Sequence, residues 1–261
     1  MRIESRITLS LVAAAVFLLA SHAPLSASQA DQSIEQSVKK SYVFKTYLKS
    51  DKIKIQSEEG AVTLEGTVSQ ESHRTLAEHT VMGLPGVKSV NNQLTVTGTP
   101  AGAGSDAELR ERVQGNLGFH RSTSAARTDV LVTNGTVTLR GNASSETQKQ
   151  LAEDYANDVS GVTGVDNKMT VTTTGPTSSQ TSGDTLDDAS ITAQVRMSEL
   201  YYHGSKPFDT KVSTSKGVVT LSGVATNQSE IDGATKRVAD IHGVTRVNNL
   251  MTVETTQSST N

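Results

Sequence analysis

Cysteine is absent from this chain of 261 residues. Its absence excludes disulfide bridges, thiolate metal sites and thiol nucleophiles, and leaves no cysteine to carry an N-terminal lipid. Together with the export signal described below, the absence of bridges is typical of a bacterial periplasm. We therefore expect a periplasmic protein without a lipid anchor.

An excess of positive charge is also missing. The chain has 24 Lys and Arg against 27 Asp and Glu, a net charge of −3. Proteins that bind nucleic acid need a basic field to meet the phosphate backbone. The charge balance therefore argues against nucleic acid as a partner.

Catalytic motifs are missing too: the chain has no H-E-x-x-H, no G-x-S-x-G and no phosphate-binding loop. Carboxylates do not recur between the repeats described below, since Glu65 is matched by Arg140 and Ser222. The histidines also occupy unrelated positions, which predicts surface side chains rather than metal ligands. We expect no enzyme, no metal and no cofactor. The histidines beyond residue 30 are His73, His79, His120, His203 and His242.

What the chain does contain is one motif in three copies. It reads E-G-A-V-T-L-E-G-T-V from Glu59, N-G-T-V-T-L-R-G-N-A from Asn134 and K-G-V-V-T-L-S-G-V-A from Lys216. A G-V dipeptide follows the first glycine of each copy at a constant distance of 26 residues. Anchors in fixed register indicate three copies of one domain of about 70 residues. The glycines that we assign a structural role are Gly60, Gly66, Gly86, Gly135, Gly141, Gly161, Gly217, Gly223 and Gly243.

The first 30 residues have the pattern of a secretory signal peptide. Arg2 and Arg6 precede an apolar run over residues 7–20, which is shorter than the roughly 20 residues of a membrane span. Small residues predict cleavage after Ala30, with Ala23 as a second candidate.

Two stretches rich in glycine, proline, serine and threonine separate the copies, and such stretches are flexible. We therefore expect three independent domains. The expected division is a signal peptide at 1–30, domains at 31–98, 105–173 and 185–255, linkers at 99–104 and 174–184, and a disordered tail at 256–261.

Each copy shows the order helix, strand, strand, helix, strand. The first helix has an apolar stripe, which is Ile34, Val38 and Tyr42 in copy one. Because the second helix connects strands two and three as a crossover, these strands should be parallel. The expected fold is α+β: three tandem αββαβ repeats, each a three-stranded mixed sheet packed by two helices. The stripes of the other copies are Leu109, Val113 and Leu117, and Ile191, Val195 and Leu200.

Small local signals mark the joints of each copy. The pairs E-G, N-G and K-G predict tight hairpin turns, and a glycine inside strand two indicates a close approach of backbones. An asparagine before strand three is expected to bond to local backbone rather than to bind a ligand. The expected N-caps of the second helix are Ser69, Ser144 and Thr226. The asparagines are Asn92, Asn167 and Asn249.

These patterns resemble the BON domain (bacterial OsmY and nodulation). The end of its signature reads G-V-K-S-V-N-N-Q-L-T-V from Gly86, G-V-T-G-V-D-N-K-M-T-V from Gly161 and G-V-T-R-V-N-N-L-M-T-V from Gly243. The resemblance implies an αββαβ fold, an envelope location, contact with phospholipid in several members, and chaperone-like roles in osmotically induced periplasmic members. The chain departs from the family in having three copies, where such stress proteins commonly carry two. Unlike the envelope lipoproteins, it has no N-terminal lipid.

Residues 39–54, which we call the lysine segment, stand out by charge. The segment contains six lysines and one acidic residue, Asp51. It also contains three of the chain's nine aromatic residues. An anionic membrane attracts each such lysine by about 1 kcal/mol, and amphipathic aromatics suit the headgroup layer. A first helix with a solvated lysine face explains the segment equally well. The candidate lipid-binding residues are Lys39, Lys40, Tyr42, Phe44, Lys45, Tyr47, Lys49, Lys52 and Lys54.

Two functions of different class follow from these patterns. The first is a non-enzymatic periplasmic envelope protein that binds anionic phospholipid surfaces in envelope or osmotic stress. The second is a soluble periplasmic chaperone-like or scaffold protein that binds periplasmic or outer-membrane client proteins.

Overall fold

The computed structural model describes residues 23–97, 102, 104–123, 128–172, 186–203 and 210–254. Residues 1–22 of the expected signal peptide, most of the linker 99–104, the whole linker 174–184 and the tail lie outside the described residues. Both candidate cleavage sites, after Ala23 and after Ala30, fall within the first helix. Within the described ranges, no helix is long and apolar enough to cross a membrane.

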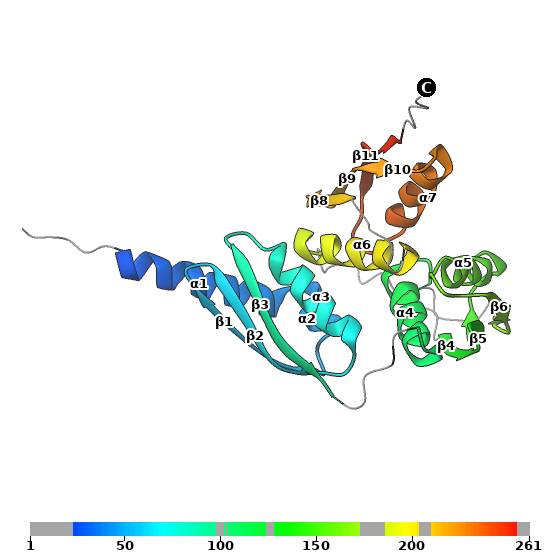
Figure 1. The fold of residues 1–261 in the computed structure, drawn as a ribbon, viewed down its shortest axis with the longest axis horizontal. Coiled ribbons are helices and arrows are strands. Elements are labelled where there is room, and N and C mark those ends of the chain that lie inside the picture. The colour runs from blue at the N-terminus through cyan, green and yellow to red at the C-terminus, as the bar shows by residue number, and fades with distance from the viewer. Residues whose placement is uncertain are drawn as a thin grey trace, which may run out of the picture.

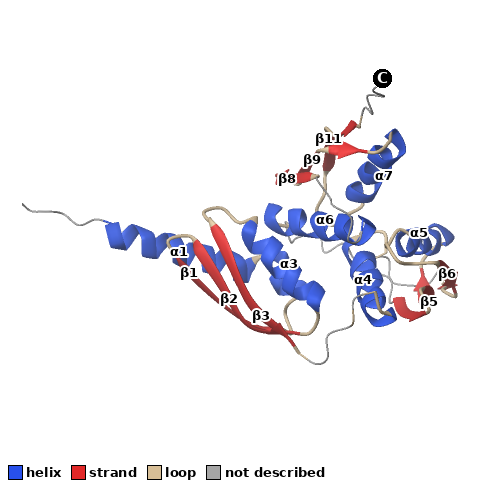
Figure 2. Ribbon diagram, in the orientation of Figure 1, coloured by secondary structure: helices blue, strands red, loops and turns tan. Residues whose placement is uncertain are grey.

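Three domains of one topology follow each other along the chain (Figures 1 and 2). Each begins with a helix, which is broken in two in domain one, and continues with an antiparallel hairpin. A second helix follows, and then a strand that runs parallel to the hairpin's second strand. This last strand is split in domain two (Gly164–Asn167 and Thr170–Val171) and in domain three (Arg246–Asn249 and Thr252–Val253). The expected α+β fold and the parallel pairing of strands two and three are confirmed.

The elements have these bounds. Domain one comprises α1 (Ala23–Lys40), α2 (Tyr42–Thr46), β1 (Lys52–Glu58), β2 (Ala61–Val68), α3 (Glu71–Met82) and β3 (Ser89–Val96). Domain two comprises α4 (Asp106–Phe119), β4 (Thr128–Thr133), β5 (Thr136–Ala143), α5 (Glu146–Asn157), β6 (Gly164–Asn167) and β7 (Thr170–Val171). Domain three comprises α6 (Asp188–His203), β8 (Lys211–Ser215), β9 (Val218–Ser222), β10 (Val224–Ala225), α7 (Gln228–Ala239), β11 (Arg246–Asn249) and β12 (Thr252–Val253).

The hairpin turns form as predicted, and each is closed by an aspartate that the sequence reading missed. Asn134 and Gly135 both have positive φ, 50° and 78°, as a tight two-residue turn requires. Their N–H groups donate to Oδ2 and Oδ1 of Asp106 at 2.7 and 2.9 Å. The expectation that no carboxylate recurs is therefore wrong, because an aspartate stands 29 residues before the first glycine of every copy. The equivalents are Asp31 at Glu59 and Gly60, and Asp188 at Lys216 and Gly217.

The glycine inside strand two is required by its backbone. Gly66 has φ of +119°, and a Cβ there would lie 2.0 Å from the carbonyl oxygen of Lys52 on the paired strand. Only glycine adopts this conformation without strain, so the predicted close approach is confirmed.

The repeated asparagine joins strand three to the second helix of its domain. Asn92 Nδ2 donates to the carbonyl of Arg74 on α3 at 3.0 Å, and Asn92 Oδ1 accepts the N–H of Leu94 at 3.2 Å. The backbone role expected for this residue is confirmed. The equivalent pairs are Asn167 with Lys149 and Met169, and Asn249 with Ile231 and Met251.

Some local predictions need correction. The first helix of domain one breaks at Ser41, so that Val43 enters the core in place of Tyr42, which is only half-buried. Leu200 is 38% exposed because the last turn of α6 points it outward. The N-caps of the second helices lie one residue later than expected, and they are Gln70, Ser145 and Asn227.

The domains do not behave as independent bodies. Helix α6 of domain three lies at the centre, with domain one on one side and domain two on the other (Figure 1). Its residues Ala189, Ala193, Met197 and Tyr201 belong to the same buried apolar cluster as the cores of domains one and two. The expectation that flexible linkers uncouple the copies is therefore wrong.

Candidate functional site

The lysine segment spreads over several elements, and its lysines do not share one face. Lys39, Lys40 and Lys45 lie on α1 and α2, exposed. Lys52 and Lys54 are exposed on β1, and alternation along the strand directs them to the sheet face away from the buried Ile55. Lys49 is exposed between α2 and β1.

The aromatic residues of the segment are half-buried, and two of them, Tyr42 and Tyr47, contact rings of the other domains. The ring of Tyr47 meets Tyr42 edge-on at 5.9 Å and Phe119 of domain two edge-on at 5.4 Å. Phe119 in turn stacks on Tyr201 of domain three at 6.2 Å. The Tyr47 hydroxyl donates to the carbonyl of Gly118 at 2.9 Å. A row of four rings therefore runs through all three domains, and Phe44 is packed beside the same core.

Domain three also caps a helix of domain one. Asp187 directly precedes α6, and its Oδ1 accepts the N–H of Ser190 at 2.8 Å, as an N-cap does. Asp187 Oδ2 accepts the N–H of Tyr42 at 2.9 Å, and Ser190 Oγ accepts the N–H of Val43 at 3.1 Å. The first two N–H groups of α2 are thus satisfied by residues about 145 positions further along the chain.

Domains two and three contact each other reciprocally. Ser160 donates its backbone N–H to the carbonyl of Tyr201 at 2.8 Å, and His242 donates its own to the carbonyl of Phe119 at 3.0 Å. Ser160 and His242 are 82 residues apart, as are Phe119 and Tyr201, so each domain offers the same positions to the other. This self-complementarity is the property of a two-fold interface. Domain one has Pro85 at the equivalent place, and proline has no N–H to donate.

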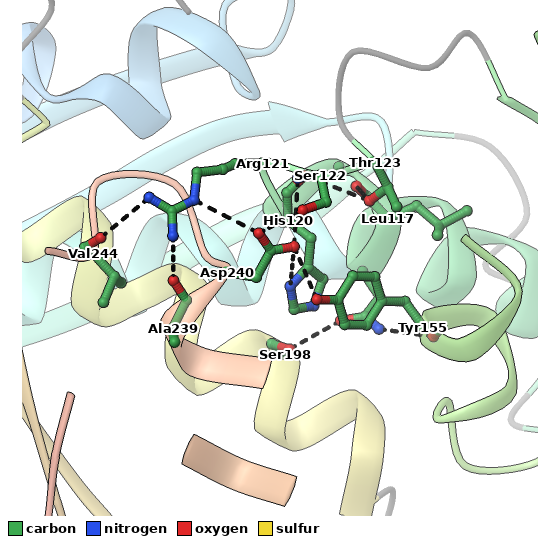
Figure 3. A network of polar contacts seen from close by, with 12 residues as sticks. Leu117, His120, Arg121, Ser122, Thr123, Tyr155, Ser198, Ala239, Asp240 and Val244 are labelled. Carbon is green, nitrogen blue, oxygen red and sulfur yellow. Dashed lines mark hydrogen bonds and ion pairs between the residues drawn. The ribbon is translucent and has the colours of Figure 1, made fainter. Parts of the chain in front are cut away.

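A polar network around Asp240 secures this contact (Figure 3). Asp240 Oδ1 accepts the hydroxyl of Ser122 at 2.7 Å, and Oδ2 accepts the hydroxyl of Tyr155 at 2.8 Å. The guanidinium of Arg121 lies 3.6 Å from Asp240 Oδ1 and donates to the carbonyl of Ala239. One aspartate of domain three thus binds three side chains of domain two.

His120 stands fully buried in the same network. Its ring stacks on Tyr155 at 3.7 Å, and its Nδ1 lies 3.8 Å from Asp240 Oδ2, too far for a hydrogen bond. Burial lowers the pKa of His120 to about 4, although the charge of Asp240 acts in the opposite direction. The imidazole is therefore neutral near pH 7, and its approach to Asp240 is not an ion pair.

The equivalent position in domain three holds a buried ion pair. Arg237, the counterpart of Tyr155, lies over the ring of Tyr202 at 3.6 Å and within 3.3 Å of Glu199 Oε2. Burial raises the pKa of Glu199, with Arg237 opposing that shift. The two halves of the interface thus share positions but differ in charge.

The histidines were expected on the surface, and this is wrong for His120, which is fully buried. The other four are half-buried. His79 and His242 face other domains, as His120 does. Burial lowers the pKa of both His79 and His242. Within the described part of the chain, no group of three or more His, Asp or Glu side chains is arranged to hold a metal ion.

Ser69, His73 and Asp51 are the residue types of a hydrolase triad, but they do not have the geometry of one. Ser69 Oγ lies 3.2 Å from His73 Nδ1, and Asp51 Oδ2 lies 2.6 Å from the same nitrogen. In a triad the serine and the carboxylate contact opposite ring nitrogens. The imidazole can then take the proton of the serine hydroxyl at one nitrogen while the carboxylate orients the ring through the other. This cluster therefore anchors the start of α3 and is not arranged to activate Ser69.

Comparison with known proteins identifies the repeat. The family model described as BON domain matches residues 30–98, 105–173 and 187–255. Osmotically-inducible protein Y of Escherichia coli (strain K12) is 29% identical over 143 residues, which cover 53% of this chain and 71% of that protein.

Two solved structures of CdsD, a structural protein of the type III secretion system of Chlamydia trachomatis, also match at 16% identity. One alignment covers 86% of this chain and 96% of that chain, and the other covers 85% and 91%. The TM-score is 0.23 in both cases, too low to carry an argument about the whole chain.

Proposed function

Because this chain belongs to the BON domain family and consists mostly of three such domains, we propose that it is a non-enzymatic periplasmic protein of osmotic or envelope stress. Its similarity to an osmotically inducible protein supports the link to osmotic stress. The signal-peptide pattern of the first 30 residues supports export.

Within that role, domain one binds the surface of an anionic phospholipid membrane. The observation that supports this is the exposure of Lys39, Lys40 and Lys45, none of which has an ion-pair partner within the described ranges. Lys45 lies on α2 between Phe44 and Tyr47, so charge and amphipathic rings occur together. Lysine near an anionic surface contributes about 1 kcal/mol, and rings of this type suit the headgroup layer.

The test is co-sedimentation of the processed chain with vesicles, either of pure phosphatidylcholine or with added phosphatidylglycerol, at low and high salt. Binding should require the anionic lipid and weaken with salt. The triple substitution of Lys39, Lys40 and Lys45 by Gln should weaken binding about 100-fold, since three contributions of about 1 kcal/mol are lost.

A control variant separates a local site from net charge. Substitution of Lys211, Lys216 and Lys236 by Gln removes the same charge from exposed positions of domain three and should leave binding nearly unchanged. Equal losses in the two triple variants would show that the lysines of domain one form no site. If the native chain does not bind anionic vesicles but suppresses the aggregation of client proteins, the result would instead support the chaperone-like function.

A further inference from the structure

We propose that domain one must separate from α6 for its aromatic residues to reach the membrane, so that the packed arrangement of the three domains is a closed form of the lipid site. This inference rests on the proposed function. The lysines of the site are exposed in the packed form, whereas the rings that accompany them lie at the domain junction.

The rings are held by contacts that cannot coexist with insertion into a headgroup layer. The Tyr47 hydroxyl donates to Gly118 and also lies 3.3 Å from Gln194 Oε1. Its ring packs between Tyr42 and Phe119, and the ring of Tyr42 lies 6.5 Å from that of His242. Tyr47 is half-buried, and its hydroxyl and the ring edges that contact Tyr42 and Phe119 must leave these partners before the whole ring can enter a headgroup layer.

Besides the shared apolar cluster and the contacts of Tyr47, two local contacts tie domain one to α6. The first is the cap in which Asp187 and Ser190 satisfy the first N–H groups of α2. The second is a close approach at the end of α3, where a Cβ added to Gly83 would lie 3.2 Å from the Cβ of Ala189 on α6. Both contacts are to α6 or to the residue directly before it, so a displacement of domain one away from α6 would break both of them together with the apolar packing.

Domains two and three stay joined when domain one separates. The reciprocal bonds of Ser160 and His242 and the network at Asp240 join domain two to domain three. Domain one stands outside this symmetry, because Pro85 occupies the donor position. It is therefore the domain whose departure leaves the reciprocal contact unbroken.

A membrane can favour the open form only by binding it more tightly than the closed form. Attraction of Lys39, Lys40 and Lys45 is available in both forms, since these side chains are exposed in the closed one. Insertion of Tyr42 and Tyr47 is available only in the open form. The rings therefore supply the difference in affinity that shifts the population.

A reversible lock tests the inference. The chain has no cysteine, so the double variant Gly83→Cys/Ala189→Cys contains the only pair that can oxidise. The Cβ separation of 3.2 Å is within about half an ångström of that in a disulfide. Oxidised protein should bind vesicles containing phosphatidylglycerol at least tenfold more weakly than the same protein after reduction, and each single variant should not respond to reductant.

Equal binding by the oxidised and reduced forms would overturn the inference and leave the proposed function standing. Failure of both forms to bind, with the native chain also inactive on vesicles, would overturn the proposed function and this inference with it. A second variant decides the question if the disulfide does not form.

That variant is Asp187→Ala, which removes an acceptor from Tyr42 and should strengthen vesicle binding several-fold. Because Asp187 also caps α6, the matched control is Asn227→Ala, which removes the cap of α7 without touching domain one. Binding that is unchanged or weaker in Asp187→Ala relative to this control would overturn the inference.

Discussion

The carboxylate of Asp106 accepts both N–H groups of the turn at Asn134 and Gly135. Asp106→Ala leaves these two donors without their partner and should lower the free energy of unfolding by about 2 kcal/mol. Urea unfolding of the full chain measures the change. Asp129→Ala removes the same charge from an exposed position on β4 and serves as the control. An equal effect of the two substitutions would mean that charge, and not the turn contact, is responsible.

The same contact makes domain one sensitive to acid. The hydroxyl of Ser57, followed by the N–H of Gly60, lowers the pKa of Asp31. A carboxyl whose pKa is lower in the folded state contributes stability above its unfolded pKa, and this stability is lost as the pH falls through the folded pKa. Protonation of Asp31 is therefore expected to lower the stability of domain one.

At the scale of elements, strand two of each domain depends on its interior glycine. Gly141 has φ of +130° in β5. A branched side chain is strained in that conformation, and the equivalent Gly66 leaves no room for a Cβ, so Gly141→Val should destabilise the chain by about 3 kcal/mol. Because α4 packs on α6, hydrogen exchange should show lost protection in domain two and in α6. Thr136→Val, at an exposed position of the same strand, should not have this effect. Lost protection confined to domain two would contradict the shared core.

The elements that sequence alone predicted are those with local signals. The turn at Asn134 and the buried faces of the second helices follow from residues a few positions apart. The parallel pairing follows from the order of elements, because a helix connects the two strands. The break at Ser41 was not predictable in this way, because the partners of Tyr42 and Val43 lie in domain three. The sequence contains one indication of the junction between the domains. An aromatic residue occupies the equivalent position of each repeat, namely Phe44, Phe119 and Tyr201.

The turn aspartates did have a signal in the sequence, a constant distance of 29 residues from the first glycine. The comparison of strand positions such as Glu65 with Arg140 could not find it, because the aspartate stands on another element. For the candidate site, the sequence predicted the exposed lysines. It could not predict that Tyr42 and Tyr47 are half-buried, since the rings that cover them belong to other domains.

At the scale of the whole molecule, His120 links the contact of domains two and three to pH. Its pKa of about 4 in the folded protein is below the value of an exposed histidine. The unfolded chain therefore takes up a proton as the pH falls below about 6.5, while the folded chain does not until about pH 4, so stability is lost across that window. At pH 5 the loss from this residue should approach about 2 kcal/mol.

The variant His120→Phe keeps a ring against Tyr155 and removes the titration. Its free energy of unfolding should change less between pH 7 and pH 5 than that of the native chain, as measured in urea at each pH. Asp240, Arg237 and His242 act on the charge of His120, and the raised pKa of the buried Glu199 works in the opposite sense. These groups are present in both proteins and cancel in the difference. The same pH dependence in both proteins would rule out His120 as its source.

The reciprocal contact of domains two and three also limits how the gene for such a protein can change in length. Loss of the coding segment for domain one would remove a domain and leave the two-fold contact complete. Loss of domain three would leave the carbonyl of Phe119 without the N–H of His242, and domain one could not take its place, because Pro85 has none to offer. Shortened descendants should therefore keep the second and third repeats together, as a single heritable unit.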